Sequence, residues 1–446
     1  MKLRLAIAAR DTFSSLRIYN FRLFFAGQSI SQVGNWLSLI AQTLLVLKLT
    51  HSGVMVGLLT AFQFAPVLIL GPWAGLVADR SDKRKLLIGV QAFAMLQSFA
   101  LAAIAYADRP PVEAVFAVAL LGGIATSFDN PARRAFVVEL VPESSVGNAV
   151  GLNSALMTGS RIIGPALAGL LISTVGYAWC FLLDGLSYVA VLTGYGLMKP
   201  SEIRREGQAE KGRGQVRAGL RYVRSVKELW IPLVMTAVIG MLTFNYSVVM
   251  PLLVKRTFGG TDGDFTMLFS VLSAGSLFGA LAAARRSEID VRNVVRAAAA
   301  FGASMLLFAA APNLTWAYPL GLIVGITSIA FMTSATAIVQ LYSDPTMRGR
   351  VLALQAMVFL GSTPIGGPIL GWICDSLTPR AGVLVGGIAA LAAAAWGHRR
   401  ATPRRVVPRR TCVRIRPPAT ETYASSVSAT RTATATTTDN HLEMTV

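Results

Sequence analysis

Two charged residues stand inside long apolar stretches of the sequence, and they are the first candidates for chemistry. Arg161 lies in the segment SRIIGPALAG, and Asp184 lies in the next apolar stretch. A cation near the middle of a bilayer costs at least about 2.5–3.5 kcal/mol unless it faces water or a partner. We therefore consider a transport or coupling role for both residues, with a buried pair that serves only the fold as the alternative.

The positions of the two residues limit how closely they can approach each other. Counted from the turn near Gly176, a helical rise of 1.5 Å per residue puts Arg161 about 22 Å and Asp184 about 12 Å deep. A direct pair would need the reach of both side chains or a bridging water. Asp129, at the inner end of an earlier apolar stretch, is a second carboxylate that could bind a proton.

Uncharged polar residues also occur in apolar stretches. Gln28, Gln32 and Asn35 are spaced i, i+4 and i+7, which places their amides on one face of a helix. Such a face lines a cavity or bonds to another helix, and both interpretations are open. The candidates for a cavity lining are Gln28, Gln32, Asn35, Asn153 and Asn245, with Trp36 as an aromatic wall.

The elements that must position these residues are membrane spans. Of the 446 residues, 54% are hydrophobic and only 14% are charged, which argues against a water-soluble enzyme. Apolar windows long enough to cross a bilayer predict twelve helices. They cover residues 22–48, 54–78, 86–107, 112–129, 148–175, 178–198, 230–254, 264–284, 294–311, 314–339, 350–374 and 381–397.

Positive charge predicts the orientation of these spans. With both termini in the cytoplasm, 35 of the 41 Lys and Arg residues fall in internal segments and five in external ones. The same placement argues against nucleic-acid binding despite the net charge of +19. We expect a multi-pass protein of a plasma membrane, in contact with lipid. We also expect it to act as a monomer.

A polar segment at 199–229 divides the spans six and six. It predicts a cytoplasmic linker with an amphipathic helix at 216–226. Gly164-Pro165 and Gly367-Pro368 recur in similar segments 203 residues apart, which indicates two parallel six-helix halves. The predicted parts are an N-terminal lead-in (1–21), the halves (22–198 and 230–397), the linker (199–229) and a disordered cytoplasmic tail (398–446).

Other classes of site find no support in the sequence. The three cysteines and three histidines are scattered, so neither a metal site nor a disulfide framework is expected. No GxxxxGK[ST] loop is present, so we expect no nucleotide and no cofactor. Covalent catalysis is not expected, and the chain is not predicted to be an enzyme.

The segment GLVADRSDKRKLL between spans 2 and 3 resembles the loop motif of the major facilitator superfamily, roughly GxLADRxGRR. Asp82 stands where that family usually has glycine. The resemblance implies a latch of Gly75, Asp79, Arg80 and Arg84 that holds the cytoplasmic side closed. Asp79 ends a helix, where the dipole disfavours an anion, so it needs a cationic partner. The alternative is a positive anchor with no latch function.

Span 5 is similar to the antiporter motif of drug:proton exchangers, roughly GxxxGPxxGG. Ser160 and Ala168 replace two of the glycines. Pro165 removes a hydrogen-bond donor and predicts a bend next to Arg161, while Gly164 permits close packing. Gly367 and Pro368 predict an equivalent bend in span 11.

Residues 15–395 together resemble the exporter branch that contains enterobactin and macrolide efflux permeases. The resemblance implies a bacterial inner-membrane exporter of small amphipathic molecules, of drug or siderophore type, coupled to H⁺ and working by alternating access. The usual arginine motif of span 4 is absent from VALLGGIATSFD, which argues against one route of proton coupling. A non-transporting interaction protein on the same scaffold and an importer are the alternatives.

Overall fold

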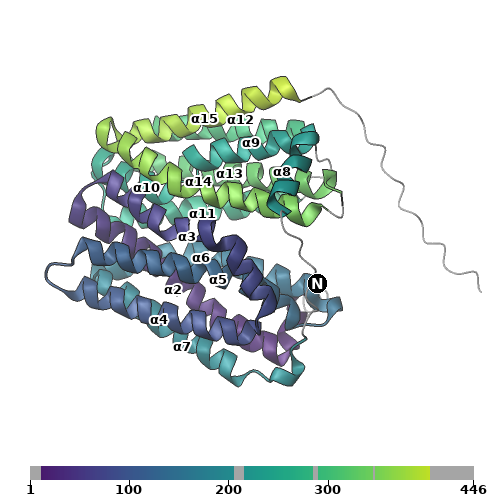
Figure 1. Ribbon diagram of the computed structural model, residues 1–446. Helices are drawn as coiled ribbons and strands as arrows, with labels where there is room; N and C mark the ends of the chain where they lie inside the picture. The colour runs from purple at the N-terminus through teal and green to yellow at the C-terminus, as the bar shows by residue number, and fades with distance from the viewer. Residues whose placement is uncertain (1–11, 205–214, 285–289, 345–346, 402–446) are drawn as a thin grey trace, which may run out of the picture. The chain divides into compact units, whose positions relative to one another are not determined.

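A computed structural model describes residues 12–204, 215–284, 290–344 and 347–401, and every regular element in these ranges is helical. Twelve helical segments are long and apolar enough to cross a membrane, which confirms the predicted number. Figure 1 shows the helices running back and forth beside one another. Most of the predicted tail, and part of the lead-in and the linker, lie outside the described residues.

The first half contains six spans. They are α2 (Tyr19–Thr50), α3 (Gly53–Arg80), α4 (Lys83–Tyr106), α5 (Val112–Glu139), α6 (Val146–Thr174) and α7 (Tyr177–Leu197). The starts of α3 and α4 are capped by side chains, because Ser52 accepts from the Met55 amide and Asp82 accepts from the Lys85 amide. Asp82, which departs from the loop motif, thus has a structural role as a helix cap.

The second half contains seven α-helices and a short π-helical segment. They are α9 (Lys227–Leu242), α10 (Tyr246–Leu252), η4 (Leu253–Thr257), α11 (Asp262–Ala284), α12 (Val291–Ala309), α13 (Leu314–Tyr342), α14 (Arg348–Ser376) and α15 (Pro379–Arg400). The predicted continuous span 7 is interrupted between Leu242 and Tyr246, so that α9 and α10 are two pieces of one span.

Span 4 is longer than predicted. The helix α5 continues through Pro131 to Glu139, whereas the polar cluster after residue 128 suggested an end at 129. Phe136 and Val137 in the extension are buried, so packing holds the helix past the proline. Arg133, which was expected in a cytoplasmic loop, therefore belongs to a span and is only 7% exposed.

The linker contains α8 (Gln215–Ser225), which confirms the helix predicted at 216–226. Val223 of α8 is fully buried in a small apolar cluster with Leu229, Val339 and Val351. The Tyr222 hydroxyl also accepts a 3.0 Å hydrogen bond from the amide of Asp344. The linker helix is thereby fixed to the second half.

The two halves repeat one packing pattern. In the first half α2 packs on α6 and α7, α3 packs on α5, and α4 packs on α5 and α7. In the second half α9 packs on α14 and α15, α11 packs on α13, and α12 packs on α13 and α15. Each helix has a counterpart six spans later, which confirms the all-α membrane fold of two six-helix halves.

Glycines bring the halves together at the contact of α3 with α14. A Cβ atom added at Gly57 would lie 2.4 Å from the carbonyl oxygen of Gly367. A Cβ atom added at Gly371 would lie 2.1 Å from the carbonyl oxygen of Gly53. Neither position has room for a larger residue. A second contact joins α6 to α11, where a Cβ at Gly169 would meet the hydroxyl of Thr266 at 1.9 Å. Small residues of this kind let helix backbones approach closely.

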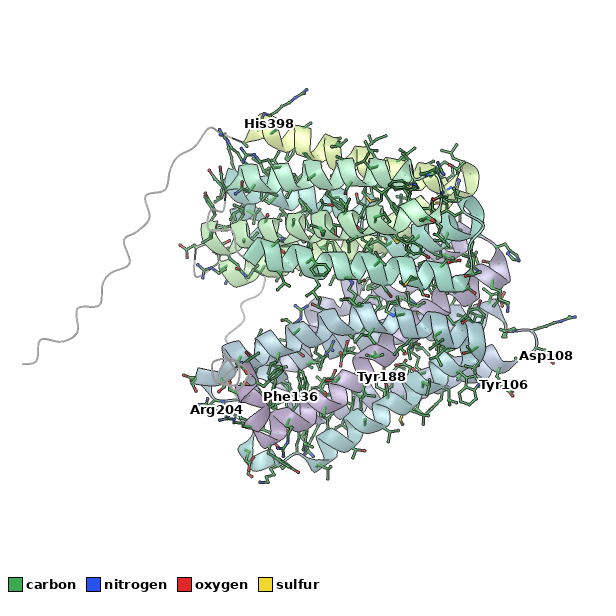
Figure 2. All side chains as sticks on the ribbon, turned by 180° about the vertical axis from the view of Figure 1, so that it is seen from behind. Tyr106, Asp108, Phe136, Tyr188, Arg204 and His398 are labelled. Carbon is green, nitrogen blue, oxygen red and sulfur yellow. The ribbon has the colours of Figure 1, made fainter. Side chains whose placement is uncertain are left out.

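The α3–α14 contact occupies one end of the spans. We call the end with Tyr106 and Asp108 the outer end and the end with Arg204 and His398 the inner end; Figure 2 shows them on opposite sides. Close approach begins at the outer end with Gly53 and Gly371 and reaches Leu68, which faces Gly361.

Nearer the inner end, one face of α3 is open, although Ala74 and Ala78 on the same stretch stay buried. Cβ atoms added at Gly71 and Gly75 would meet nothing within 4 Å. Trp73 in the same stretch is 59% exposed. The glycines that bring α3 close to α14 therefore lie in the outer part of α3.

Gly57→Ala and Gly71→Ala test this difference on one helix. We expect Gly57→Ala to lower the free energy of unfolding by about 1–3 kcal/mol, because the added methyl group overlaps the α14 backbone. Gly71→Ala should leave it unchanged or raise it by about 0.5–1 kcal/mol, because alanine favours the helix. Thermal melting of the purified protein in detergent measures both; equal melting temperatures would contradict the packing described.

Candidate functional site

Arg161 lies at the middle of α6 and faces an aromatic side chain of α2. Its guanidinium carbon is 5.6 Å from the ring centroid of Trp36, a cation–π distance. The helices are close here because a Cβ at Gly164 would lie 2.3 Å from the Cβ of Trp36. Pro165 is buried next to this contact. The glycine and proline of the span 5 motif thus set the place of Arg161 against Trp36.

The other half completes the surroundings of Arg161. Phe269 of α11 contacts Trp36 with ring centroids 5.9 Å apart. Tyr246, at the start of α10, is within electrostatic range of Arg161. The buried Nε atom of Arg161 and the buried hydroxyl of Tyr246 both lack a hydrogen-bond partner. Arg161 therefore lies where the two halves meet.

Asp184 is located elsewhere, inside the first half. It is 2% exposed, and its Oδ2 accepts a 2.7 Å hydrogen bond from the hydroxyl of Ser98 on α4. Its Oδ1 has no hydrogen-bond partner and lies 2.7 Å from where a Cβ of Gly34 would be. No ion pair joins Asp184 to Arg161 in the described part of the chain. The two residues that the sequence singled out thus occupy separate environments.

The amides of span 1 bond to other helices of the first half. Gln28 donates to the Tyr195 hydroxyl at 3.2 Å and accepts from Gln32 at 3.1 Å. Asn35 accepts a 2.8 Å hydrogen bond from the Tyr188 hydroxyl. This geometry is that of interhelical bonds, and contact of these amides with a substrate stays a prediction. Asn153 is half-buried on α6.

Arg133 and Asp129 form an ion pair that the sequence analysis did not anticipate. The Nε of Arg133 lies 3.1 Å from Oδ2 of Asp129, one helical turn earlier on α5. Arg133 also donates to Gln28 at 3.4 Å, and Gln91 of α4 donates to Asp129 at 2.7 Å. The network thus links α2, α4 and α5. The i, i+4 spacing in FDNPARR was the available signal, but a span ending at 129 hid it.

Arg84, in the first turn of α4, joins the start of that helix to the end of α7. Arg84 donates to the Tyr195 carbonyl at 2.7 Å and to the Gly196 carbonyl at 3.2 Å, at the end of α7. Asp79 is half-buried near the end of α3, and Arg80 is exposed. The orphan carbonyls of a helix terminus favour a cation, so Arg84 caps α7.

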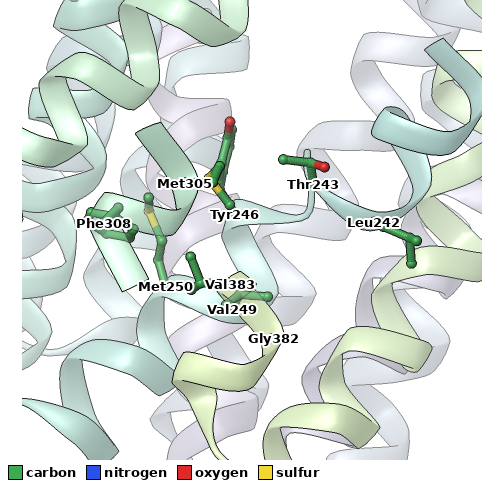
Figure 3. A pocket seen from close by; sticks show the side chains of 9 residues that line it. All are labelled: Leu242, Thr243, Tyr246, Val249, Met250, Met305, Phe308, Gly382 and Val383. Atoms are coloured by element: carbon green, nitrogen blue, oxygen red, sulfur yellow. The ribbon is translucent and has the colours of Figure 1, made fainter. Parts of the chain in front are cut away.

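The break in span 7 borders a small apolar pocket. Asn245 precedes α10, and its side-chain amide donates a 2.7 Å hydrogen bond to the Met241 carbonyl. This hydrogen bond spans the interruption between α9 and α10. Gly366 of α14 packs on this turn, since its Cβ would lie 1.8 Å from that carbonyl. Figure 3 shows the pocket, lined by Leu242, Thr243, Tyr246, Val249, Met250, Met305, Phe308, Gly382 and Val383.

A polar network at the outer end joins the two halves. The carboxylate of Asp375 on α14 accepts from the amides of Gly53 and Val54 at 2.8 and 2.9 Å and from the Ser52 hydroxyl at 2.8 Å. These groups form the N-terminus of α3, where a negative charge is favourable. Arg256 pairs with Asp375 at 2.7 Å and also donates to the His51 carbonyl. Asp375 therefore caps a helix of the other half.

A second polar contact between the halves lies at the same end. The Tyr177 hydroxyl of α7 donates to Asp262 of α11 at 2.6 Å. Asp262 also pairs with Lys255 at 2.6 Å, and Lys48 lies 5.2 Å from the centroid of the Tyr177 ring. Lys255 and Lys48 each support, within their own half, one of the two residues that bond across the halves.

Asp375→Ala tests whether the outer network keeps the halves together. The substitution removes two hydrogen bonds from backbone amides and an ion pair, so the contact between the halves should open more often. We expect the labelling rate of a cysteine at position 60 to rise about tenfold. Thr60 is 3% exposed and lies beside Gly367. The measurement uses an impermeant maleimide on a chain without Cys180, Cys374 and Cys412.

The control for this experiment is Glu202→Gln, which removes the exposed pair of Glu202 with Lys199 at the inner end. Labelling at position 60 should stay at the starting rate in this variant. If Asp375→Ala labels no faster than Glu202→Gln, the network does not hold the halves together.

Arg133→Ala tests the buried ion pair. It leaves the Asp129 carboxylate without its cation, which costs about 3–5 kcal/mol for a buried pair and should lower the melting temperature. Arg134→Ala is the matched control, because Arg134 is the next residue and is exposed. Removal of both charges, in Arg133→Met with Asp129→Leu, should restore most of the stability. Equal melting of the two single variants would show that the pair is not structural.

Comparison with known proteins identifies the family. The sequence profile described as transmembrane secretion effector matches residues 10–414. The staphyloferrin A transporter of Staphylococcus aureus is 25% identical over 58% of this chain and 66% of its own length. Macrolide efflux protein A of Streptococcus pyogenes is 23% identical over 78% of this chain and 87% of its own length.

Solved structures share the fold. A POT family transporter in complex with 5-aminolevulinic acid has a TM-score of 0.71 and 10% identity, covering 85% of this chain and 96% of that one. The nucleoside transporter NupG has a TM-score of 0.69 and 14% identity, covering 87% and 100%. These similarities confirm the major facilitator fold. The chain therefore belongs to the transmembrane secretion effector family, a family of membrane transporters of the major facilitator type.

Proposed function

We propose that the protein exports small amphipathic molecules by alternating access. The observation that carries this proposal is the position of Arg161, a half-buried cation with a buried Nε atom, between two halves whose tightest contacts among the described residues lie toward the outer end. A substrate between the halves would contact both, and rocking one half against the other would expose it to alternate sides. The names of two relatives, a siderophore transporter and a macrolide efflux protein, support a small-molecule cargo.

The orientation follows from the distribution of charge. We place the inner end, with Arg204 and His398, in the cytoplasm of a bacterium, because most Lys and Arg residues fall in segments at that end. Both termini are then cytoplasmic, and the contact of α3 with α14 is on the external side. In this conformation the substrate enters from the cytoplasm.

The latch belongs to the opposite conformation. Gly75 faces open space and Asp79 and Arg80 lie at the inner end of α3, so they are positioned to meet the second half when the inner ends approach. During this change Arg84 would keep its hydrogen bond to the end of α7. We therefore assign the loop after α3 to stabilisation of the outward-open state.

Proton binding by a buried carboxylate would couple transport to the H⁺ gradient. Asp184 is the first candidate, because one of its oxygens lacks a partner and a proton on it removes a buried charge. Asp129 is the second candidate, and its proton would weaken the pair with Arg133. A bound proton would shift the population of the two states. The protein would act as a monomer without a cofactor.

Flux in liposomes tests the proposal. The purified chain is reconstituted, a pH gradient is imposed, and movement of a panel of amphipathic fluorescent dyes is followed. We expect gradient-driven exchange with the wild type and a loss of at least about tenfold with Asp184→Asn, which mimics the protonated form. Ser187→Ala on the same helix serves as a control for the substitution itself.

The outcomes separate the alternatives. Dye movement toward the cytoplasmic face would indicate an importer, and no movement of any dye would favour a non-transporting membrane protein. Gradient-driven flux that is unchanged in Asp184→Asn but lost in Asp129→Asn would move the coupling site to the pair with Arg133. Unchanged flux in both variants would refute coupling through these carboxylates.

A further inference from the structure

We propose that Arg161 is the binding group for the anionic end of the substrate, so that the protein selects organic acids, above all carboxylates attached to a flat apolar body. This inference rests on the proposed function, because it assigns a substrate class to the same site. It begins from the pairing of Arg161 with an aromatic ring at the junction of the halves, where no described carboxylate lies within ion-pair distance of the guanidinium.

The first step is the charge balance within the spans. Arg161 is a full positive charge near the middle of α6, and among the described residues no carboxylate lies within ion-pair distance of it. A cation at this depth requires water or an anion. The ring of Trp36 compensates the charge only in part. The site therefore keeps a net positive charge that a bound anion would neutralise.

The second step concerns the carboxylates described above, each of which already accepts a hydrogen bond or forms an ion pair. Asp184 accepts from Ser98, and Asp129 pairs with Arg133. At the outer end, Asp262 pairs with Lys255 and Asp375 with Arg256. Three of these carboxylates pair with a cation and Asp184 bonds to a hydroxyl, so none of the four neutralises Arg161.

The third step is the shape of the surroundings. Trp36 and Phe269 provide two aromatic faces, from α2 and α11. Tyr246 adds a hydroxyl that is buried and unbonded. Guanidinium groups bind carboxylates with two parallel hydrogen bonds, and aromatic rings favour flat apolar groups. A ligand that combines a carboxylate with a flat apolar body fits both requirements.

The fourth step connects the site to transport. Arg161 and Trp36 belong to the first half, whereas Phe269 and Tyr246 belong to the second. An anion between them would contact both halves and would be sensitive to their separation. A cationic substrate would instead meet a like charge in a desolvated place, which is unfavourable.

Three naphthalene probes of one size test the selection. The purified full chain in detergent is titrated by calorimetry with 2-naphthoate, 2-naphthamide and 2-naphthylmethylammonium. We expect the carboxylate to bind about tenfold more tightly than the neutral amide, because a charge-assisted hydrogen bond replaces a neutral one. The ammonium probe should bind most weakly.

Substitutions then assign the preference to Arg161. Arg161→Met should bind carboxylate and amide equally, while Arg161→Lys should keep part of the preference, since it keeps the charge and loses the planar fork. Arg134→Met removes an exposed cation of α5 and should bind like the wild type. Where Arg161→Met does not fold, Arg161→Gln gives the same comparison, with thermal melting as the check on folding.

The contrary results are equally defined. Equal affinity of the three probes, tighter binding of the ammonium, a preference that survives in Arg161→Met, or no binding of any probe would each overturn the assignment. The binding measurement needs no pH gradient, so its result does not depend on whether the protein transports the probe. Selective binding without flux in liposomes would refute the proposed function only, and flux without carboxylate selection would refute this inference only.

Discussion

The close approach of backbones between α3 and α14 is the constraint on which the arrangement of the halves depends. At Gly57 and Gly371 the opposing main chains leave no room for a Cβ atom, so the contact exists only because both helices carry glycine there. The same helices carry the cap of Asp375 on α3 at the outer end. Backbone packing and a polar network therefore act at one place, the outer part of α3.

The charged side chains of the membrane spans follow a common rule. Asp129 and Arg133 neutralise each other, and Asp375 neutralises Arg256 while it caps a helix. An isolated charge is expensive in such a medium, so pairing stabilises each of these residues. Two charged residues depart from this rule. Asp184 accepts a hydrogen bond from a hydroxyl and has no cation beside it, and Arg161 faces the ring of Trp36 with no described carboxylate within ion-pair distance. At Arg161 we expect a ligand to supply the missing anion.

The sequence predicted the larger scale of the structure better than its contacts. Apolar windows determine where a chain can cross a bilayer, so the twelve spans, the linker helix and the two halves could be predicted. Tertiary packing decided the rest. Pro131 and the polar residues around it suggested an end that buried Phe136 overrides. The break at residues 243–245 contains no glycine or proline that would predict it. The partner of Arg161 was sought in Asp184, because depth along a helix says nothing about which way a side chain faces.

The cap that Asp375 supplies has a consequence for the cost of opening the outer end. Two backbone amides in the first turn of α3 donate their hydrogen bonds to a carboxylate from the other half. In the rocking motion that we propose, separation of the halves at this end would remove the acceptor of those amides and expose them to water, so the first turn of α3 would fray. Local unfolding of that helix end would then accompany the opening, and the free energy of opening the outer end would depend partly on the backbone amides of residues 53 and 54.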